Sequence, residues 1–390
     1  MTESYGRSRH VAVVVENVAL GVDIRLRKQV RDLLDAGYRV SVVSMRDDDN
    51  APYREVPGLT LLEYPAPPEG GGMVGYLREY VAAFGWAALR LGRLRMRGRI
   101  DVLQLCQPPD VYFPLARVLR WLGARVVVDQ RDLMPEVFAA RYDNPRRSVL
   151  SALRFLERRS QRVAHRTVCA NEYLRDRLVA AGGRHVEVVR NGPVLARVET
   201  AERDGALLAG RRHLVCWAGK MGRQDRVDLA MRVAAEVVHT HGRTDCVFAF
   251  LGDGECLAEM RSLATELGLD GSVRLPGWLP EADVFRHLAT ADLGLDTTLQ
   301  AEVTPVKALE YMAFGIPLVS FDLPETRRVA ADAGVLVTPE DVATLAKEIV
   351  RLLDDPAARV RLGAVGRERV RDELCWERQA AVYLGAIARA

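Results

Sequence analysis

Two glycine turns with nearby cations are the first features of the sequence that could do chemistry. The segment WAGKMGRQDRVD (217–228) holds Gly219, which Lys220 follows directly and Arg223 follows four residues later. A similar turn, GDG, begins at Gly252 after the next apolar run, although this turn alone is a weak signal. Cations and free backbone N–H groups at the start of a helix can neutralise a diphosphate. The pattern therefore predicts a phosphate site in the second half of the chain.

A second candidate group lies in AEVTPVKALEYMAFGIPLVSFDLPETRRVA (301–330). Glu302 and Glu310 are eight residues apart, and Lys307 and Glu310 share one face of a helix expected over 305–314. A carboxylate there can accept hydrogen bonds from both hydroxyls of a ribose. The alternative is an ordinary surface ion pair, worth under about 1 kcal/mol. The spacing alone favours the ion pair.

A third candidate is the loop after the first apolar run, HVAVVVE (10–16), where Gly21 precedes a helical pattern. Such a loop can bring backbone N–H groups to an anion, and a plain strand-to-helix connection is equally compatible with it. The loop lacks the G-x-G-x-x-G pattern of dinucleotide-binding enzymes. A dehydrogenase is therefore disfavoured.

The elements that must position these residues form two similar series. The chain has 390 residues, which suits two domains of roughly 150–200 residues. Short β-branched runs alternate with amphipathic helical patterns, and the alternation restarts after a polar stretch at 198–212, which we interpret as a linker. Strands are predicted at 10–16, 39–45, 59–65, 101–106, 125–130, 165–171, 213–219, 246–252, 272–277, 292–297 and 316–321, and helices at 26–37, 74–97, 226–240, 255–267, 280–290, 305–314 and 341–371. This order predicts an α/β protein with two tandem, doubly wound parallel sheets, whose ligands lie beyond the carboxyl ends of the strands.

Several segments together carry a family resemblance. They are GVDIRLRKQVRDLLDAGYRV (21–40), VVVDQRDLMPE (126–136), VVRNGP (188–193), WAGKMGRQDRVD, FLGDGE and KALEYMAFGIPLVSFDLPETR (307–327). Over nearly its whole length the chain resembles the GT-B glycosyltransferases, and specifically glycosyltransferase family four, the retaining nucleotide-sugar enzymes. The resemblance implies the GT-B fold, with two Rossmann-like domains facing a cleft and a C-terminal helix (374–388) that crosses back. We accordingly expect an acceptor-binding domain at 1–192 plus 375–390 and a nucleotide-sugar domain at 193–374.

The resemblance also implies roles for single residues. In that family the carboxylate at the position of Glu310 holds the ribose, which reverses the preference for a surface ion pair. Lys220 falls where the family supplies a cation to the diphosphate, and Gly21 falls where the N-terminal loop approaches the donor. Gly219, Arg223, Gly252 and Lys307 complete the expected donor site. The expected reaction uses no cofactor beyond the nucleotide sugar and no metal.

Two departures from the family pattern concern the donor. The family has a glycine–aromatic–glycine stretch after the first of two glutamates eight apart, whereas Glu302 is followed by VTP (303–305), so its contact with the donor sugar is open. The second phosphate lysine of the family falls at Asp225, which could also be a carboxylate at a helix N-terminus. We predict that Lys307 or Arg223 supplies the missing cation.

A third departure concerns catalysis, because Arg131 falls where many relatives carry a histidine facing the donor sugar. An arginine does not deprotonate and cannot be a general base, but it could clamp a phosphate or an acceptor carboxylate. The retaining reaction is usually drawn as front-face attack, in which the leaving diphosphate oxygen takes the acceptor proton. Asp132 and Glu136 could orient an acceptor hydroxyl, or equally cap the following helix. The catalytic candidates are Arg131, Asp132 and Glu302.

The composition of the chain limits the kinds of partner and the compartment that we expect. The net charge of +3 does not require a nucleic-acid partner. Only four of the 55 basic residues are lysines, and two of them are Lys220 and Lys307. Arginine-rich runs at 90–99 and 145–166 could dock on an anionic membrane carrying a lipid-linked acceptor, or could be solvated helix faces. No C-x-x-C spacing and no run of about 20 apolar residues occurs, so a cytoplasmic protein with reduced thiols, with or without membrane contact, is expected.

The function expected from these observations is transfer of a hexose-type sugar, with retention, from a nucleoside diphosphate sugar to an acceptor hydroxyl. A UDP-sugar is the first choice of donor. The acceptor could be a glycan, a lipid carrier or a small natural product. Because Arg131 and Asp225 depart from the family pattern, the chain could instead be a catalytically weak GT-B partner subunit. A nucleotide-sugar epimerase or hydrolase on the same fold is a further alternative.

Overall fold

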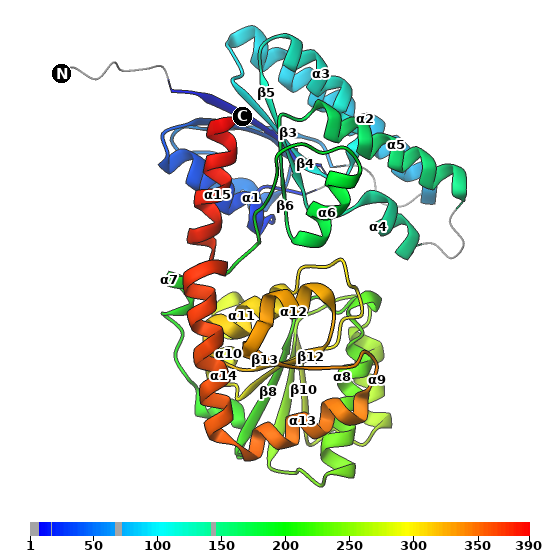
Figure 1. Ribbon diagram of the computed structural model, residues 1–390, viewed down its shortest axis with the longest axis vertical. Coiled ribbons are helices and arrows are strands. Elements are labelled where there is room, and N and C mark those ends of the chain that lie inside the picture. Colours follow the sequence, from blue (N-terminus) through cyan, green and yellow to red (C-terminus); the bar gives the residue numbers. More distant parts are fainter. Residues whose placement is uncertain (1–7, 17, 67–71, 142–145) are drawn as a thin grey trace, which may run out of the picture. The chain divides into compact units, whose positions relative to one another are not determined.

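The computed structural model of the chain describes residues 8–16, 18–66, 72–141 and 146–390. The chain divides into two compact units, one of residues 1–189 with 380–390 and the other of residues 190–379. Each unit is built on one parallel β-sheet with helices on both of its faces (Figure 1). The two tandem doubly wound sheets expected from the alternation of strand and helix patterns are thereby confirmed.

The first unit holds a seven-stranded sheet in the order β3-β2-β1-β4-β5-β6-β7. All neighbouring strands are parallel, with Val11 of β1 opposite Val40 of β2 on one side and Val102 of β4 on the other. The strands are β1 His10–Val14, β2 Arg39–Met45, β3 Leu59–Tyr64, β4 Val102–Gln107, β5 Arg125–Gln130, β6 Arg166–Cys169 and β7 Val186–Val188. The helices are α1 Ile24–Asp35, α2 Gly72–Arg97, α3 Phe113–Trp121, α4 Met134–Arg141, α5 Arg147–Val163 and α6 Glu172–Ala180, with residues 380–390 of the last helix added.

The second unit holds a six-stranded parallel sheet in the order β10-β9-β8-β11-β12-β13. Its strands are β8 His213–Ala218, β9 Cys246–Leu251, β10 Val273–Gly277, β11 Leu293–Asp296, β12 Leu318–Phe321 and β13 Gly334–Val337. Its helices are α7 Leu195–Val198, α8 Val227–Ala235, α9 Leu257–Glu266, α10 Glu281–Thr290, α11 Val306–Phe314, α12 Pro324–Ala330, α13 Val342–Asp354 and α14 Pro356–Arg369, and α15 Trp376–Arg389 follows.

Local sequence explains where the elements begin and end. The run HVAVV of β1 is buried on both faces, as expected of a central parallel strand. Helix α1 begins after Asp23, whose carboxylate accepts a hydrogen bond from the Leu26 N–H at 2.9 Å, and Gly37 takes a left-handed conformation just beyond its end. The two faces of the second sheet are covered by separate apolar clusters, one including Trp217 and Phe248 and the other including Tyr311.

Several expectations differ from the structure. Strand β13 was not foreseen, whereas the helices expected at 341–371 are present as α13 and α14, which part at Asp355, ahead of Pro356. The stretch 198–212 is not a free linker, because Leu207 and Leu208 pack against the apolar cluster of the second unit.

Each sheet reverses its strand order at one point, between β1 and β4 in the first unit and between β8 and β11 in the second. Helices that leave neighbouring strands there go to opposite faces, and the carboxyl ends of these strands are where open α/β sheets bind ligands. We call these two places the first and the second switch point. They bring Gly21 and the loop after β4 to one sheet edge, and Gly219 and Asp296 to the other.

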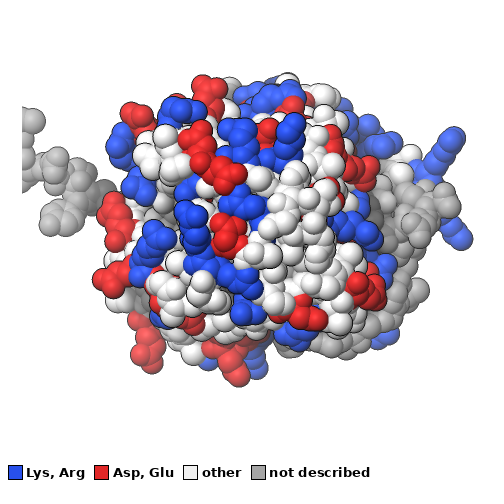
Figure 2. Space-filling view, turned by 90° about the horizontal axis from the view of Figure 1, so that it is seen from below, with Lys and Arg blue, Asp and Glu red and all other residues white. Residues whose placement is uncertain are grey.

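Two further features concern possible partners, namely the distribution of charged side chains on the surface and the apolar character of the helices. On the face of the molecule in Figure 2, acidic and basic side chains are intermingled, in line with the small net charge. Across the described ranges of the chain, no helix combines the length and the apolar character needed to cross a bilayer.

Candidate functional site

The second switch point is formed by two glycine turns packed backbone to backbone. Gly219 follows β8 and Gly252 follows β9, and both have positive φ angles, +157° and +136°. The Gly219 N–H donates to Leu251 O at 2.9 Å, and a Cβ on Gly252 would lie only 1.9 Å from the Gly219 carbonyl oxygen. Only glycine fits there, so the two turns predicted from sequence lie against each other at one sheet edge.

The cations of the first of these turns are exposed. Lys220 directly follows Gly219, and Arg223 opens a single 3-10 turn that ends at Asp225. Within the described part of the chain, neither the Lys220 ammonium nor the Arg223 guanidinium forms an ion pair. Their positive charges are available to an anionic ligand, and a diphosphate is the ligand expected at this place.

Lys307 is different, because the protein itself neutralises it. Its ammonium reaches from α11 to Asp225 Oδ1 at 3.1 Å and to Asp296 Oδ1, at the end of β11, at 3.5 Å. It also lies 4.7 Å from the centre of the Trp217 ring. Burial by itself would lower the pKa of Lys307, but the Asp296 and Asp225 carboxylates outweigh burial and raise it above its ordinary value.

This arrangement bears on the cation that the sequence seemed to lack. Asp225 stands where the resemblance implies a lysine, and Lys307 supplies the opposite charge to it from another helix. Because two carboxylates already neutralise the Lys307 ammonium, its charge is not available to a ligand. Of the two cations put forward for the missing role, Arg223 is therefore the one whose side chain remains available.

Helix α11 is anchored to the switch point through Tyr311. The Tyr311 hydroxyl accepts a hydrogen bond from the Ala218 N–H at 2.9 Å and donates to Leu295 O at 3.2 Å. Its ring lies on Gly294, where a Cβ would come within 2.2 Å of the ring. These contacts fix the helix that carries Glu310, which is half-buried, while Glu302 lies half-buried in the turn before the helix.

At the first switch point, Arg131 lies in a buried network of opposite charges. It follows β5 and forms ion pairs with Asp23, at the start of α1, and with Asp129, at 3.4 Å. Asp129 is fully buried and also pairs with Arg25 at 2.7 Å. Burial favours the neutral acid, yet the Arg25 and Arg131 charges outweigh it and lower the pKa of Asp129. The charge of Arg131 is thus balanced by two carboxylates, which weakens the idea that it clamps an anion.

A chain of buried hydrogen bonds extends this network to the last helix. The Gln29 amide donates to Asp129 Oδ2 at 3.0 Å, and the Gln104 amide donates to Gln29 Oε1 at 3.0 Å. The Tyr383 hydroxyl of α15 then donates to Gln104 Oε1 at 2.6 Å. The C-terminal helix therefore packs onto the first unit, as the resemblance implied, and helps to hold Asp129.

The other predicted residues of the first unit have definite places. The Gly21 N–H donates to Asn50 Oδ1 at 3.0 Å, and a Cβ on Gly21 would meet Asp49 O at 1.9 Å, so its amide already has a partner. Asp132 is exposed just beyond Arg131, and the Gln130 amide donates to its carbonyl oxygen at 2.8 Å. Glu136 pairs with Arg177, which belongs to α6.

Sequence reasoning missed several residues that build these sites. They are Asp23, Arg25, Asp129, Asp296 and Tyr311. One signal was available for Tyr311, because a tyrosine within the apolar run YMAF of a helix needs a partner for its hydroxyl. No group of three or more His, Cys, Asp or Glu side chains that could hold a metal ion is found among the residues that the structure describes.

Two family models match the chain in sequence. The model described as "Glycosyl transferase 4-like domain" matches residues 21–192, and the model described as "Glycosyl transferases group 1" matches residues 212–355. The matches fall on the first and the second unit, respectively, and include every candidate site residue of both.

Curated relatives match over part of their length. A GDP-mannose-dependent monoacylated alpha-(1-6)-phosphatidylinositol monomannoside mannosyltransferase of Corynebacterium glutamicum is 33% identical over 148 residues, which cover 35% of this chain and 37% of the relative. An alpha-D-kanosaminyltransferase of Streptomyces kanamyceticus is 29% identical over 168 residues, covering 43% and 42%. The chain thus spans about two fifths of the length of these relatives.

Solved structures match over almost the whole chain. Sucrose-phosphate synthase from Thermosynechococcus elongatus superimposes with a TM-score of 0.78 at 17% identity, covering 98% of both chains. Anabaena HepE in complex with UDP-glucose gives a TM-score of 0.72 at 14% identity, covering 98% of this chain and 100% of that one. These likenesses show the fold. With both family models and two parallel sheets of this order, the chain belongs to the GT-B glycosyltransferases and resembles glycosyltransferase family four.

Proposed function

We propose that the chain transfers a hexose-type sugar, with retention, from a nucleoside diphosphate sugar to an acceptor hydroxyl. The observation that carries the proposal is the second switch point. Two cations, Lys220 and Arg223, whose side chains form no ion pair with the residues that the structure describes, stand on glycine turns beside the helix that carries Glu310. That combination provides positive charge for a diphosphate and a carboxylate for a ribose. UDP-glucose bound to HepE and the GDP-mannose in the name of the Corynebacterium relative support a nucleotide sugar.

In the proposed reaction the acceptor hydroxyl attacks the anomeric carbon from the side of the leaving diphosphate. The carbon–oxygen bond to the diphosphate breaks, and the leaving oxygen takes the proton of the acceptor. Lys220 and Arg223 stabilise the negative charge that develops on the leaving group. No protein base is needed, which suits a chain that has Arg131 in place of a histidine. Asp132 and Glu302 are proposed to orient the acceptor and the donor sugar.

Donor turnover is the direct test of the proposal. The purified chain is incubated with UDP- and GDP-sugars, with and without candidate glycan, lipid and natural-product acceptors, and release of nucleoside diphosphate is measured. Retention is read from the anomeric configuration of the product by NMR. Release without any acceptor would favour a hydrolase, and a new sugar nucleotide would favour an epimerase. Absence of nucleotide binding to the whole panel would contradict the proposal.

A single substitution tests the ribose contact. Glu310→Gln keeps the shape of the side chain and removes its charge, so we expect the affinity for the donor nucleotide to fall about 10- to 150-fold, as for the loss of a charge-assisted hydrogen bond of about 1.5–3 kcal/mol. Glu266→Gln, on the exposed surface of α9, is the matched control. Equal affinities of the two variants by calorimetry would remove Glu310 from the proposed site.

A further inference from the structure

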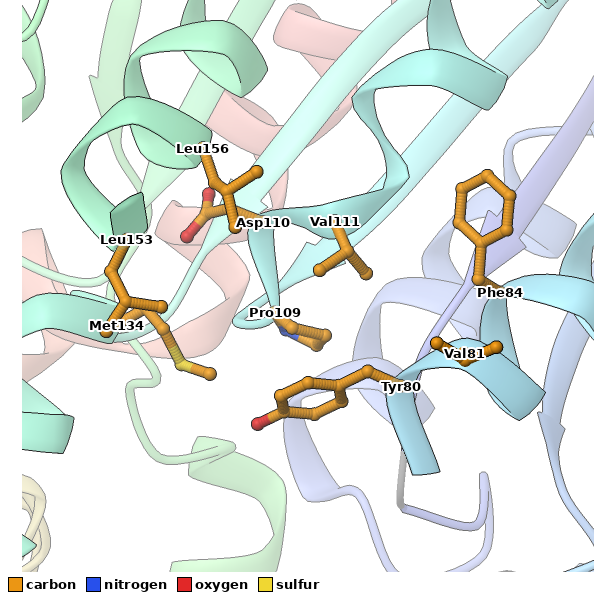
Figure 3. A pocket seen from close by; sticks show the side chains of 9 residues that line it. All are labelled: Tyr80, Val81, Phe84, Pro109, Asp110, Val111, Met134, Leu153 and Leu156. Carbon is orange, nitrogen blue, oxygen red and sulfur yellow. The ribbon is translucent and has the colours of Figure 1, made fainter. Parts of the chain in front are cut away.

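An apolar pocket of about 330 Å³ opens in the first unit between α2, α4 and α5. In Figure 3 the side chains of Tyr80, Met134 and Leu153 surround one common space, with Pro109 forming its back. Val81 lies at the surface with 64% of its area exposed, so solvent reaches the pocket. A pocket of this size and character suits an apolar group of a small ligand.

The position of the pocket in the sheet ties it to ligand binding. Pro109, Asp110 and Val111 line it, and they follow the end of β4 at Gln107, which is one of the two strands of the first switch point. Ligands of open α/β sheets bind at this place. The first unit is the one that we expect to hold the acceptor.

Among the described residues that line the pocket, one carries a carboxyl group, and it does not bring a fixed charge. Asp110 is buried, and burial together with the neighbouring Glu157 raises its pKa to about 8. At neutral pH the carboxyl is therefore mostly protonated, and the pocket remains compatible with an apolar occupant.

The outer face of α5 is cationic. Its exposed arginines recur at spacings of seven and four residues and so share one side of the helix, namely Arg147, Arg154, Arg158 and Arg162. Phe155 is 45% exposed among them, with the Arg159 guanidinium 4.9 Å from the centre of its ring. The same helix provides Leu153 and Leu156 to the pocket. Exposed arginines with an exposed aromatic ring, on a helix whose other side lines an apolar pocket, complement an anionic lipid surface.

We propose that the pocket between α2, α4 and α5 binds the aliphatic chain of a lipid-linked acceptor, and that the arginine face of α5 docks on the anionic membrane carrying it. This rests on the proposed function, because it names the acceptor class of the same enzyme. The chain enters past Val81 and lies against Leu153 and Met134, and the hydroxyl to be glycosylated stays outside the pocket. Binding itself needs no nucleotide.

The chain-binding part is tested by calorimetry with butyl, hexyl and octyl β-glucoside below their micelle concentrations. Each buried methylene is expected to tighten binding about fourfold. Val81→Trp narrows the opening of the pocket without changing the apolar core of the first unit, so it should abolish the increase in affinity with chain length. Leu89→Trp, on the same helix, 41% exposed and outside the pocket, is the matched control and should retain it.

Three outcomes would overturn the chain-binding part. They are affinities that do not depend on chain length, equal behaviour of the Val81 and Leu89 variants, and tighter binding of phenyl β-glucoside than of octyl β-glucoside. The last result would indicate an aromatic acceptor in place of a lipid.

The docking part is tested by co-sedimentation with vesicles of phosphatidylglycerol and of phosphatidylcholine. The chain should bind the anionic vesicles, and Arg154→Gln/Arg158→Gln should weaken this binding about 25-fold, at about 1 kcal/mol per arginine. Arg232→Gln/Arg361→Gln removes two exposed arginines of the second unit as the control. Equal loss in both double variants, or equal binding to both vesicles, would overturn the docking part.

These measurements separate the two proposals. If the alkyl glucosides and vesicles bind as expected but no nucleotide sugar is turned over, the proposed function fails and the lipid site stands. If sugar is transferred from nucleotide sugars to soluble acceptors but the affinity for alkyl glucosides does not depend on chain length, the lipid site is contradicted and the proposed function stands.

Discussion

At the first switch point Arg25 and Arg131 are balanced by Asp129 and Asp23, whereas at the second the exposed side chains of Lys220 and Arg223 form no ion pair among the described residues. The second switch point also contains a neutralised cation, Lys307, but it lies beneath the turn and not at its surface. The same topology thus carries an internally balanced charge network in one unit and available positive charge in the other.

This difference indicates that charged residues have different roles in the two units. Buried ion pairs hold backbone and side chains in place, since breaking one leaves a charge without compensation. Exposed cations on rigid glycine turns are suited to an incoming anion. The first unit therefore uses its charges to hold its own structure together, whereas the second keeps exposed cations, which the proposed function assigns to the diphosphate of the donor.

Removing Asp129 should break the balanced network and have the largest effect. Asp129→Ala leaves the Arg25 and Arg131 charges buried without their shared partner, and we expect a loss of about 3–5 kcal/mol in the free energy of unfolding. Asp176→Ala removes an exposed partner of Arg175 and should cost under about 1 kcal/mol. Denaturant unfolding measures both, and hydrogen exchange should place the loosening in the first unit. Similar stability of the two variants would contradict the network.

The packed glycine turns should tolerate no side chain. In Gly252→Ala the new methyl group meets the Gly219 carbonyl at a positive φ angle, so the turn must move and stability should fall by about 1–3 kcal/mol. Nucleotide affinity should fall with it, because Lys220 follows Gly219. Gly271→Ala has open space and serves as the control. Thermal unfolding and nucleotide titration, compared between the two variants, check this expectation.

Substitutions of two lysines should have separate effects, one on stability and the other on UDP binding. Lys307→Met leaves Asp296 buried without its cation and should lower the unfolding free energy by about 2 kcal/mol. Lys220→Ala should leave the melting temperature unchanged and weaken UDP binding about tenfold, by loss of a charge-assisted contact of about 1.5 kcal/mol. Lys347→Ala, exposed on α13, should change neither quantity. If Lys220→Ala binds UDP like the Lys347 variant, the exposed cation has no part in the donor site.

A pH titration probes a buried acid of the first switch point. Burial raises the pKa of Glu16 to about 8, although Tyr112 donates a hydrogen bond to its carboxylate and opposes the shift. Between pH 4.5 and about 8 the native state keeps a proton that the unfolded state releases, so stability falls as pH rises through this window. Glu16→Gln should reduce this slope by up to about 1.4 kcal/mol per pH unit. A slope equal to that of the Glu266→Gln control would show that Glu16 is ionised in the native state.

The strands and the glycine turns were predictable because their signals are local. Runs such as HVAVV show β-branched residues in sequence, and the positive φ angles of Gly219 and Gly252 need the residue type that the motif displays. Strand β13 was missed since GVLV is short and follows a region without clear periodicity.

The charge partners were not predictable, because they join residues far apart in the chain. Arg131 and Asp23 are 108 positions apart, and Lys307 and Asp225 are 82 positions apart. A single sequence shows each of these residues as a polar position at a strand or helix end, with nothing to pair them. The resemblance pointed to Glu310, and its contact with a ribose stays a prediction.

The C-terminal helix has one further consequence. Because residues 380–390 complete the first unit and residues 190–379 form the second, the second unit is an insertion within the first. Its two ends lie side by side, since the Arg190 N–H donates to Gln379 Oε1 at 2.8 Å and the Trp376 N–H donates to Pro193 O at 2.8 Å. During synthesis on the ribosome, the unit that starts first therefore finishes last. All seven of its strands precede the inserted unit, but Tyr383 can reach Gln104 only after the inserted unit has been made.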